Sequence, residues 1–296
     1  MRDFAIGVTS VLVGWARPSW RPLSAWLTVY QSRLEGRRLA PKTLRNKIAL
    51  IRRLSLTLGD QPLRSITPYH LQSIVQQYIE RGTPCAAKSV CILLKDIFRE
   101  AILNNWIESN PAMYLRTPST PVQRDRLILE EWRIIYKAAQ EHCRRYVHLS
   151  MLLALVSAQR RGDISAFRRS DVQDNHLFLV QQKTGMKIAL PLNLYNEAVG
   201  MSLGDVLDQC PGNDYLLGNK RINPWSLSYG FCTARDIAFP RERWTVPPSF
   251  HEQRSLSERL YRDQAINTQR LLGHKSAKMT DKYNDDRGRE FQRLIL

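Results

Sequence analysis

Four side chains near the C-terminus have the types and the spacing of a site that could attack a phosphate. His251 and Arg254 stand three residues apart, so on a helix they would share one face and approach one anionic group together. Gly273 suits the left-handed position that closes a helix, which would place His274 in a tight turn, with Tyr283 on or just past the next helix. A phenol can be the nucleophile while cations hold and neutralise the phosphate. Each residue alone would more often be packing or solvated surface, so the prediction depends on their order and spacing.

This segment resembles the C-terminal motif of the tyrosine recombinases, which reads His-x-x-Arg, then Leu-Gly-His, then Tyr. Integrases of lambda-type phages carry a similar tail over a longer stretch. The matching runs here are His251-Glu252-Gln253-Arg254, Leu272-Gly273-His274 and Tyr283-Asn284-Asp285-Asp286-Arg287-Gly288-Arg289-Glu290. The resemblance implies a DNA strand transferase that forms a 3′-phosphotyrosyl intermediate at Tyr283 and needs neither metal nor ATP.

The same resemblance adds two catalytic candidates. Arg160 follows an apolar run in a Gln-Arg-Arg-Gly-Asp sequence, where the family has its first catalytic Arg. Asp163 is a candidate partner for one of these arginines, and Ala158 stands where the family usually has Gly. Lys183 lies in a Lys-Thr-Gly sequence at the tip of a predicted hairpin, where similar integrases have a Lys that acts as general acid.

Composition agrees with a polyanionic partner. The chain has 296 residues and a formal net charge of +17, which indicates binding to nucleic acid or an anionic surface. It contains neither a Gly-x-x-x-x-Gly-Lys phosphate loop nor a paired-carboxylate metal site, so we expect no nucleotide and no metal cofactor. The scattered cysteines predict reduced thiols in a cytosolic protein. The resemblance implies a bacterial host and association with its nucleoid when the protein is bound to DNA. They are Cys85, Cys91, Cys143, Cys210 and Cys232.

The pattern of apolar residues predicts a mainly α protein with a small antiparallel β-sheet. Residues 20–117 read as short amphipathic helices in a bundle, which the resemblance identifies as a core-type DNA-binding domain. Residues 118–126 read as an exposed linker rich in proline and arginine, and residues 127–296 as an α+β catalytic domain. Residues 1–19 form an atypical leader whose apolar run is too short for a membrane helix. Lambda-type integrases usually begin with an arm-binding domain, which we do not expect in residues 1–19 because that stretch is too short to fold into one.

Several local elements are also predicted. A helix starting at Pro41 carries cationic side chains that we expect to contact DNA phosphates. They are Lys42, Arg45, Arg52 and Arg53. A helical apolar stripe runs from Leu23 to Leu34, and Thr67-Pro68 is predicted to start a further helix whose apolar stripe reaches Tyr78. Other predicted helices cover residues 86–101, 129–142, 146–156, 198–210 and 226–238, and the predicted strands cover residues 176–180 and 186–190.

The partner predicted by this resemblance is duplex DNA at a core attachment site, bound by a homotetramer. An excision factor and a DNA-bending host protein are further candidate partners, and no membrane contact is expected. The apolar end Phe291–Leu296 is expected to form a short strand on a neighbouring subunit. Two alternatives stay open: an idle DNA-binding remnant of a defective prophage, and nicking and closing of the kind seen in type IB topoisomerases.

Overall fold

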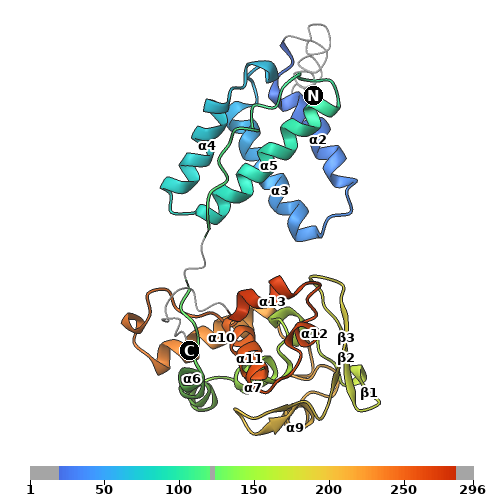
Figure 1. Ribbon diagram of the computed structural model, residues 1–296, viewed down its shortest axis with the longest axis vertical. Coiled ribbons are helices and arrows are strands. Elements are labelled where there is room, and N and C mark those ends of the chain that lie inside the picture. Colours follow the sequence, from blue (N-terminus) through green and yellow to red (C-terminus); the bar gives the residue numbers. More distant parts are fainter. Residues whose placement is uncertain (1–19, 121–123, 285–296) are drawn as a thin grey trace, which may run out of the picture. The chain divides into compact units, whose positions relative to one another are not determined.

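The computed structural model describes residues 20–120 and 124–284, and the chain divides into two compact units with the boundary between residues 121 and 122 (Figure 1). The predicted leader 1–19 and the predicted terminal strand 291–296 lie outside the described residues. Each unit has its own buried apolar cluster. None of the helices in the described part of the chain combines the length and the apolar surface needed to cross a membrane.

Residues 20–120 of the first unit form a bundle of four helices, most of which start at a proline. Proline is favoured at the first helical position because its missing N–H has no intrahelical partner there, and three of the four helices begin with it. The predicted helices are confirmed, with small shifts at their ends. They are α2 (Leu23–Glu35), α3 (Pro41–Leu58), α4 (Pro68–Glu80) and α5 (Pro84–Leu103), with the short 3-10 turn η2 (Leu63–Ser65) between α3 and α4.

The second unit is built around α7 (Arg145–Ser157), which is apolar on every side and buried throughout its last nine residues. α6, α9, α10 and α11 pack against it. The remaining elements follow in chain order. They are α6 (Leu129–His142), α8 (Arg161–Ile164), η3 (Arg169–Asp171), β1 (Val172–Gln173), β2 (His176–Val180), β3 (Lys187–Pro191), β4 (Tyr195–Asn196), β5 (Met201–Ser202), α9 (Leu203–Gln209), α10 (Pro224–Ala238), η4 (Arg241–Arg243), α11 (Glu252–Asp263), α12 (Thr268–Leu272) and α13 (Ala277–Asn284).

The predicted hairpin is confirmed. β2 pairs antiparallel with β3 from His176 opposite Pro191 to Val180 opposite Lys187, and β1 adds a short third strand that the sequence did not predict. The mainly α fold with a small antiparallel sheet is therefore confirmed.

The helix predicted over residues 198–210 is wrong in its first half. Residues 195–202 form the β4–β5 hairpin, and only Leu203–Gln209 is helical. Two local features cause the change. Gly200 takes a left-handed φ of +65° in the hairpin turn, and Ser202 caps the later helix through the backbone N–H of Asp205 at 3.2 Å.

The two ends of the predicted linker 118–126 contact different units. Lys88 donates to the hydroxyl of Thr120 on the first unit. On the second unit, the buried carboxylate of Asp125 accepts from the backbone N–H groups of Thr245 at 2.7 Å and Val246 at 3.2 Å. Residues 121–123, in the middle of the predicted linker, lie outside the described residues. The predicted bounds of the linker, 118 and 126, therefore stay a prediction.

Candidate active site

The last three helices bring the motif residues together as the spacing predicts. His251 is the residue before α11 and already has helical angles, while Arg254 lies in the first turn of that helix. α12 ends at Gly273, whose φ of +62° is left-handed. A Cβ at Gly273 would also come within 2.6 Å of Ile188 Cδ1, so this turn requires glycine. His274 follows directly, and α13 carries Tyr283.

Arg254 is a buried cation held by backbone carbonyls. Its side chain is 1% exposed, and its guanidinium donates to the carbonyls of Ala158 and, at 2.7 Å, of Leu272. Within the described residues it forms no ion pair, and its Nε has no hydrogen-bond partner. Burial, followed by the charge of Arg160, lowers the pKa of Arg254 to about 10. An anion beside this group would supply both the missing charge and the missing acceptor.

Ala158 adopts the left-handed conformation, with φ +55° and ψ +21°, between α7 and α8. A residue with a Cβ pays roughly 1–2 kcal/mol there, whereas glycine does not. This conformation explains why glycine suits the position. In this chain the carbonyl of Ala158 accepts from Arg254, so the strained turn places an acceptor for the buried guanidinium.

Arg160 is joined to the hairpin through two buried glutamines. Its Nη1 donates to Oε1 of Gln181 at 2.8 Å. The Gln181 amide donates to Gln159 Oε1 at 2.8 Å and to the carbonyl of Leu272 at 3.0 Å. Gln159 also donates to the carbonyl of Leu271 at 2.9 Å. Sequence analysis did not single out these glutamines. Their only signals are positional: Gln159 directly precedes Arg160, and Gln181 directly follows β2.

Asp163 does not pair with an arginine, contrary to the expectation. Its Oδ1 accepts the backbone N–H of Gln182 at 2.9 Å, and within the described residues it forms no ion pair. The reason is its position: α8 places the carboxylate at the base of the β2–β3 turn, where a backbone donor is within reach. Asp163 therefore fixes the hairpin that carries Lys183.

Tyr283 lies among both histidines and Arg254. Its hydroxyl is 3.4 Å from His251 Nε2, and its ring stacks on His274 with centroids 5.4 Å apart. The Arg254 guanidinium carbon is 5.9 Å from the ring centroid. The backbone carbonyl of Tyr283 accepts from Ser255 at 3.2 Å, which ties α13 to α11. Four of the six predicted residues thus make mutual contacts.

Arg160 and Lys183 approach this group from the side of the sheet. The charge of Arg160 contributes to lowering the pKa of both histidines, and Lys183 contributes at His251. Lys183 itself is exposed at the turn after β2, and no hydrogen bond of its side chain is found in the part of the chain that the structure describes. It is close enough to act by charge but makes no direct contact with Tyr283.

Both histidines are neutral at pH 7 in the protein without DNA. Burial, followed by the charges of Arg254 and Arg160, lowers the pKa of His274 to about 4. The pKa of His251 also falls to about 4, first through loss of solvent and then through nearby cations. His274 Nδ1 lies 2.9 Å from the hydroxyl of Thr280, which orients its ring.

These shifts predict acid sensitivity of the free protein. A histidine whose folded pKa lies below its unfolded value of about 6.5 takes up its proton first in the unfolded chain, so its contribution is intact above that pH and lost as pH falls toward 4. We expect the urea midpoint to fall between about pH 7 and pH 5.5, a window above the ordinary carboxyl range. His274→Gln should reduce this slope, whereas His142→Asn, at an exposed ring, should not. Equal midpoints at both pH values would contradict the assignment.

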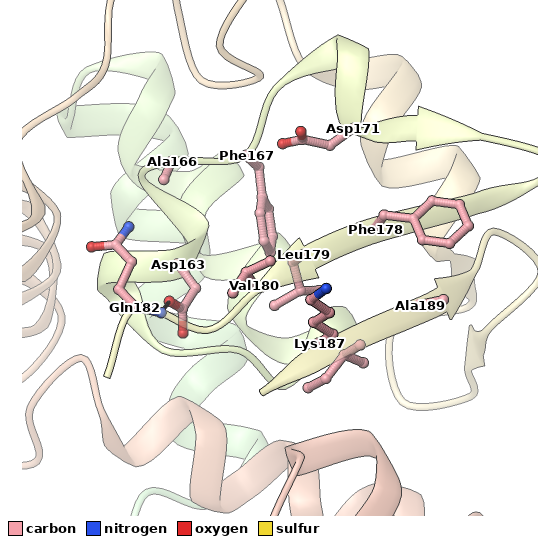
Figure 2. Close-up of a pocket in the computed structure, with 11 residues that line it drawn as sticks. Asp163, Ala166, Phe167, Asp171, Phe178, Leu179, Val180, Gln182, Lys187 and Ala189 are labelled. Carbon is pink, nitrogen blue, oxygen red and sulfur yellow. Dashed lines mark hydrogen bonds between the residues drawn. The ribbon is translucent and has the colours of Figure 1, made fainter. Parts of the chain in front are cut away.

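A groove of about 750 Å³ lies beside the site rather than in it. Figure 2 shows Asp163 and Gln182 at one end and Phe178 and Ala189 at the other, along β2 and β3. None of the six predicted catalytic residues lines it. The cluster around Tyr283 is therefore not the wall of this groove.

The four predicted DNA-contact residues all lie exposed on α3. Lys42, Arg45 and Arg52 recur at helical spacing and share one face. Arg53 differs, because it donates to the Tyr78 hydroxyl at 2.7 Å and covers that ring. Part of its guanidinium is therefore engaged inside the bundle.

Metal-ligand geometry is not found among residues 20–120 and 124–284. No group of three or more His, Cys, Asp or Glu side chains in these ranges could hold an ion, and the five cysteines are free thiols. The polar groups that surround Tyr283 are instead imidazoles and guanidinium, which bind anions.

Comparisons with known proteins agree with this geometry. A model of the phage integrase family matches residues 125–289, and a model of the phage integrase central domain matches residues 25–118. The integrase of Escherichia phage HK022 is 39% identical over 285 residues, covering 93% of this chain and 78% of that protein. The integrase of Escherichia phage lambda is 38% identical over 286 residues, covering 93% and 79%.

Solved structures give the same result. A lambda integrase tetramer bound to a Holliday junction superposes with a TM-score of 0.86 at 36% identity, covering 93% of this chain and 80% of that chain. A lambda integrase dimer bound to a COC′ core site superposes with a TM-score of 0.85 at 37% identity, covering 93% and 99%. The chain belongs to the phage integrase family and is a tyrosine recombinase similar to the lambda-type integrases.

Proposed function

We propose that this chain is a site-specific recombinase that cleaves and rejoins duplex DNA through Tyr283, for integration and excision of phage DNA. The observation that supports it most is the position of the Tyr283 hydroxyl, 3.4 Å from His251 Nε2 and beside a buried arginine that has no carboxylate partner in the described residues. A nucleophile, a proton acceptor and an anion-binding cation occur there together.

In the proposed reaction, Tyr283 Oη attacks the scissile phosphorus while the bond from phosphorus to O5′ breaks. The phenol proton passes to His251 Nε2, and Lys183 gives a proton to the departing O5′. The products are a 3′-phosphotyrosyl bond and a free 5′-hydroxyl. The covalent bond conserves the energy of the phosphodiester, so a 5′-hydroxyl from a partner duplex can reseal the strand without ATP.

The arginines and His274 act on the charge of the phosphate. Arg160 and Arg254 offer planar guanidinium groups to the nonbridging oxygens, with charge-assisted hydrogen bonds. His274 adds a further donor once the phosphate is bound. His251 is neutral before DNA binds, since its pKa is about 4, so its Nε2 is available to accept the phenol proton. An ordinary phenol pKa near ~10 makes that assistance necessary at neutral pH.

The assembly we propose follows the relatives. Lambda integrase has been solved as a dimer on a core site and as a tetramer on a Holliday junction. We propose the same homotetramer here, on a core attachment site, with an excision factor and a DNA-bending host protein as candidate partners. Residues 20–117 would form the core-binding domain, with Lys42, Arg45 and Arg52 on phosphates, and residues 127–296 the catalytic domain. The reaction would take place on the nucleoid in the bacterial cytoplasm.

Covalent trapping tests this function. A pool of duplexes with a randomised core, each nicked so that the 5′-hydroxyl fragment is lost after cleavage, is incubated with the chain. We expect DNA adducts that survive detergent, with the nucleotide on Tyr283 by peptide mapping, and sequencing of the trapped strands names the core site. DNA binding without any adduct would indicate that the chain is a catalytically idle DNA-binding remnant. Relaxation of supercoiled DNA without strand exchange on the selected site would indicate nicking and closing of the topoisomerase type.

Replacing Lys183 should slow cleavage by removing the proton donor to O5′. We expect Lys183→Ala to lose on the order of 10²-fold in single-turnover cleavage, the lower range of general-acid effects. A substrate with sulfur in place of O5′ should restore the rate, because a thiol with a pKa near ~8.5 leaves without protonation. Lys187→Ala, an equally exposed lysine on β3, is the matched control and should cleave normally. An equal loss on both substrates would assign Lys183 to binding.

A further inference from the structure

The helix that carries Tyr283 has little apolar surface with which to dock. Among the described side chains of α13, Thr280 is buried, Tyr283 is half-buried and Met279 is 42% exposed. Segments with few buried apolar contacts sit at the low end of local stability. Polar contacts must therefore contribute much of what holds α13 in place.

Among the described residues, four polar contacts join α13 to the rest of the unit. Thr280 contacts His274 at 2.9 Å, the Tyr283 hydroxyl lies 3.4 Å from His251 Nε2, and the carbonyl of Tyr283 accepts from Ser255 at 3.2 Å. The fourth contact is ionic: Arg262 Nη2 lies 3.7 Å from Asp281 Oδ1. Of these four, this ion pair alone involves no residue of the cluster around the phenol and no atom of Tyr283.

Arg262 is held in advance by a buried carboxylate. Glu258 is 0% exposed, and its Oε1 accepts from Arg262 Nε at 2.9 Å and Nη2 at 2.7 Å. The same oxygen accepts from Thr268 at 3.0 Å, at the start of α12. An ion pair normally loses side-chain entropy on both sides. Here the Arg262 side chain is already ordered by Glu258, so its contact with Asp281 loses less side-chain entropy than an ordinary surface ion pair.

The ion pair between Arg262 and Asp281 lies on the side of α13 that faces away from the Tyr283 ring. Residues two apart on an α-helix point about 200° apart around its axis. Asp281 therefore faces away from Tyr283, toward the end of α11, while the tyrosine ring faces the histidines. Pulling Asp281 toward Arg262 keeps α13 against α11 without occupying the space where a phosphate would bind.

We propose that Glu258, Arg262 and Asp281 form an electrostatic bracket that positions the Tyr283 helix against α11. These are positioning residues: none touches the reacting atoms, and they act by raising the fraction of molecules in which Tyr283 is docked. As a statement about cleavage, the proposal rests on the proposed function. As a statement about helix docking, it stands without DNA.

Variants at Asp281 test the bracket without disturbing buried Glu258. In single-turnover cleavage of a trapped core-site duplex, we expect a two- to fivefold loss for Asp281→Asn, a loss near tenfold for Asp281→Lys, and recovery with Asp281→Glu. DNA affinity should not weaken. The ratio of wild type to Asp281→Asn should approach one as salt rises to about 0.5 M, because exposed charges are screened. Asp263→Asn, which removes an exposed carboxylate next to Arg262, is the matched control and should cleave like the wild type.

Hydrogen exchange without DNA separates this proposal from the recombinase assignment. Asp281→Lys should speed amide exchange over residues 277–284, and Asp263→Asn should not. If the wild type forms no adduct but this difference is seen, the bracket stands and the proposed function fails. If exchange in α13 is unchanged by Asp281→Lys, or if Asp263→Asn slows cleavage as much as Asp281→Asn, the bracket is wrong.

Discussion

Tyr283→Phe is expected to abolish covalent DNA adducts while leaving DNA affinity and stability close to those of the wild type. The change removes one oxygen and keeps the ring that stacks on His274 and lies beside Arg254. The hydroxyl lies 3.4 Å from His251 Nε2, which is long for a hydrogen bond, and it also interacts with the Arg254 side chain, so we expect only a small loss of stability. With no nucleophile, cleavage should fall below detection rather than by a modest factor.

The measurement is detergent-resistant adduct on the trapped core-site duplex, with binding followed by gel shift. Tyr195→Phe is the matched control, because that tyrosine is 49% exposed on β4 of the same unit. It should form adducts at the wild-type rate. Adducts that persist in Tyr283→Phe would place the nucleophile elsewhere and overturn the mechanism.

Arg254→Lys should give the second-largest loss, on the order of 10²–10³ in single-turnover cleavage, the usual effect of removing one transition-state donor. Lysine keeps a positive charge and three donors, but all three lie on one nitrogen rather than along a planar fork, so they do not match the separate positions of two carbonyls and a phosphate. We also expect about 1–3 kcal/mol of lost stability, because a buried carbonyl of Ala158 or Leu272 would lose its donor.

A lysine substitution at a second buried arginine distinguishes the loss of cleavage rate from the loss of stability. Arg235 is 8% exposed and donates to the carbonyl of Pro248 at 2.7 Å, yet it makes no contact with Tyr283. Arg235→Lys should lower the unfolding midpoint, while its folded fraction should cleave at the wild-type rate. If both lysine variants cleave equally well once corrected for folding, Arg254 is a structural residue and not part of the phosphate site.

Local physical chemistry explains why so much of the site was predictable. Spacing along one helix puts His251 beside Arg254, and a left-handed glycine turns the chain at His274; neither depends on distant residues. The predicted strand His176–Val180 likewise follows from a short apolar run and from a turn containing Gly185, whose φ is +69°.

Two predictions failed for different reasons. Asp163 beside two arginines suggested an ion pair, but α8 and the base of the hairpin bring the backbone N–H of Gln182, which is distant in the chain, within its reach. Residues 198–202 were predicted to begin a helix, but two local features, the left-handed Gly200 and the cap at Ser202, favour a hairpin that packs beside α9. Apolar periodicity encodes neither the distant donor nor the local turn and cap.

The sequence predicted the groups of the proposed reaction: one phenol, two imidazoles, two guanidinium groups and an ammonium. Helical spacing and a left-handed glycine act over a few residues, so they predicted how His251, Arg254 and His274 are placed, whereas Arg160 and Lys183 followed from the resemblance to the tyrosine recombinases. Only the tertiary structure decided how these groups are held. Gln159 and Gln181 join Arg160 to the C-terminal end of α12, carbonyls rather than carboxylates surround Arg254, and Arg262 reaches across to Asp281. These contacts join residues far apart in the chain, whose proximity exists only after the second unit has packed around α7.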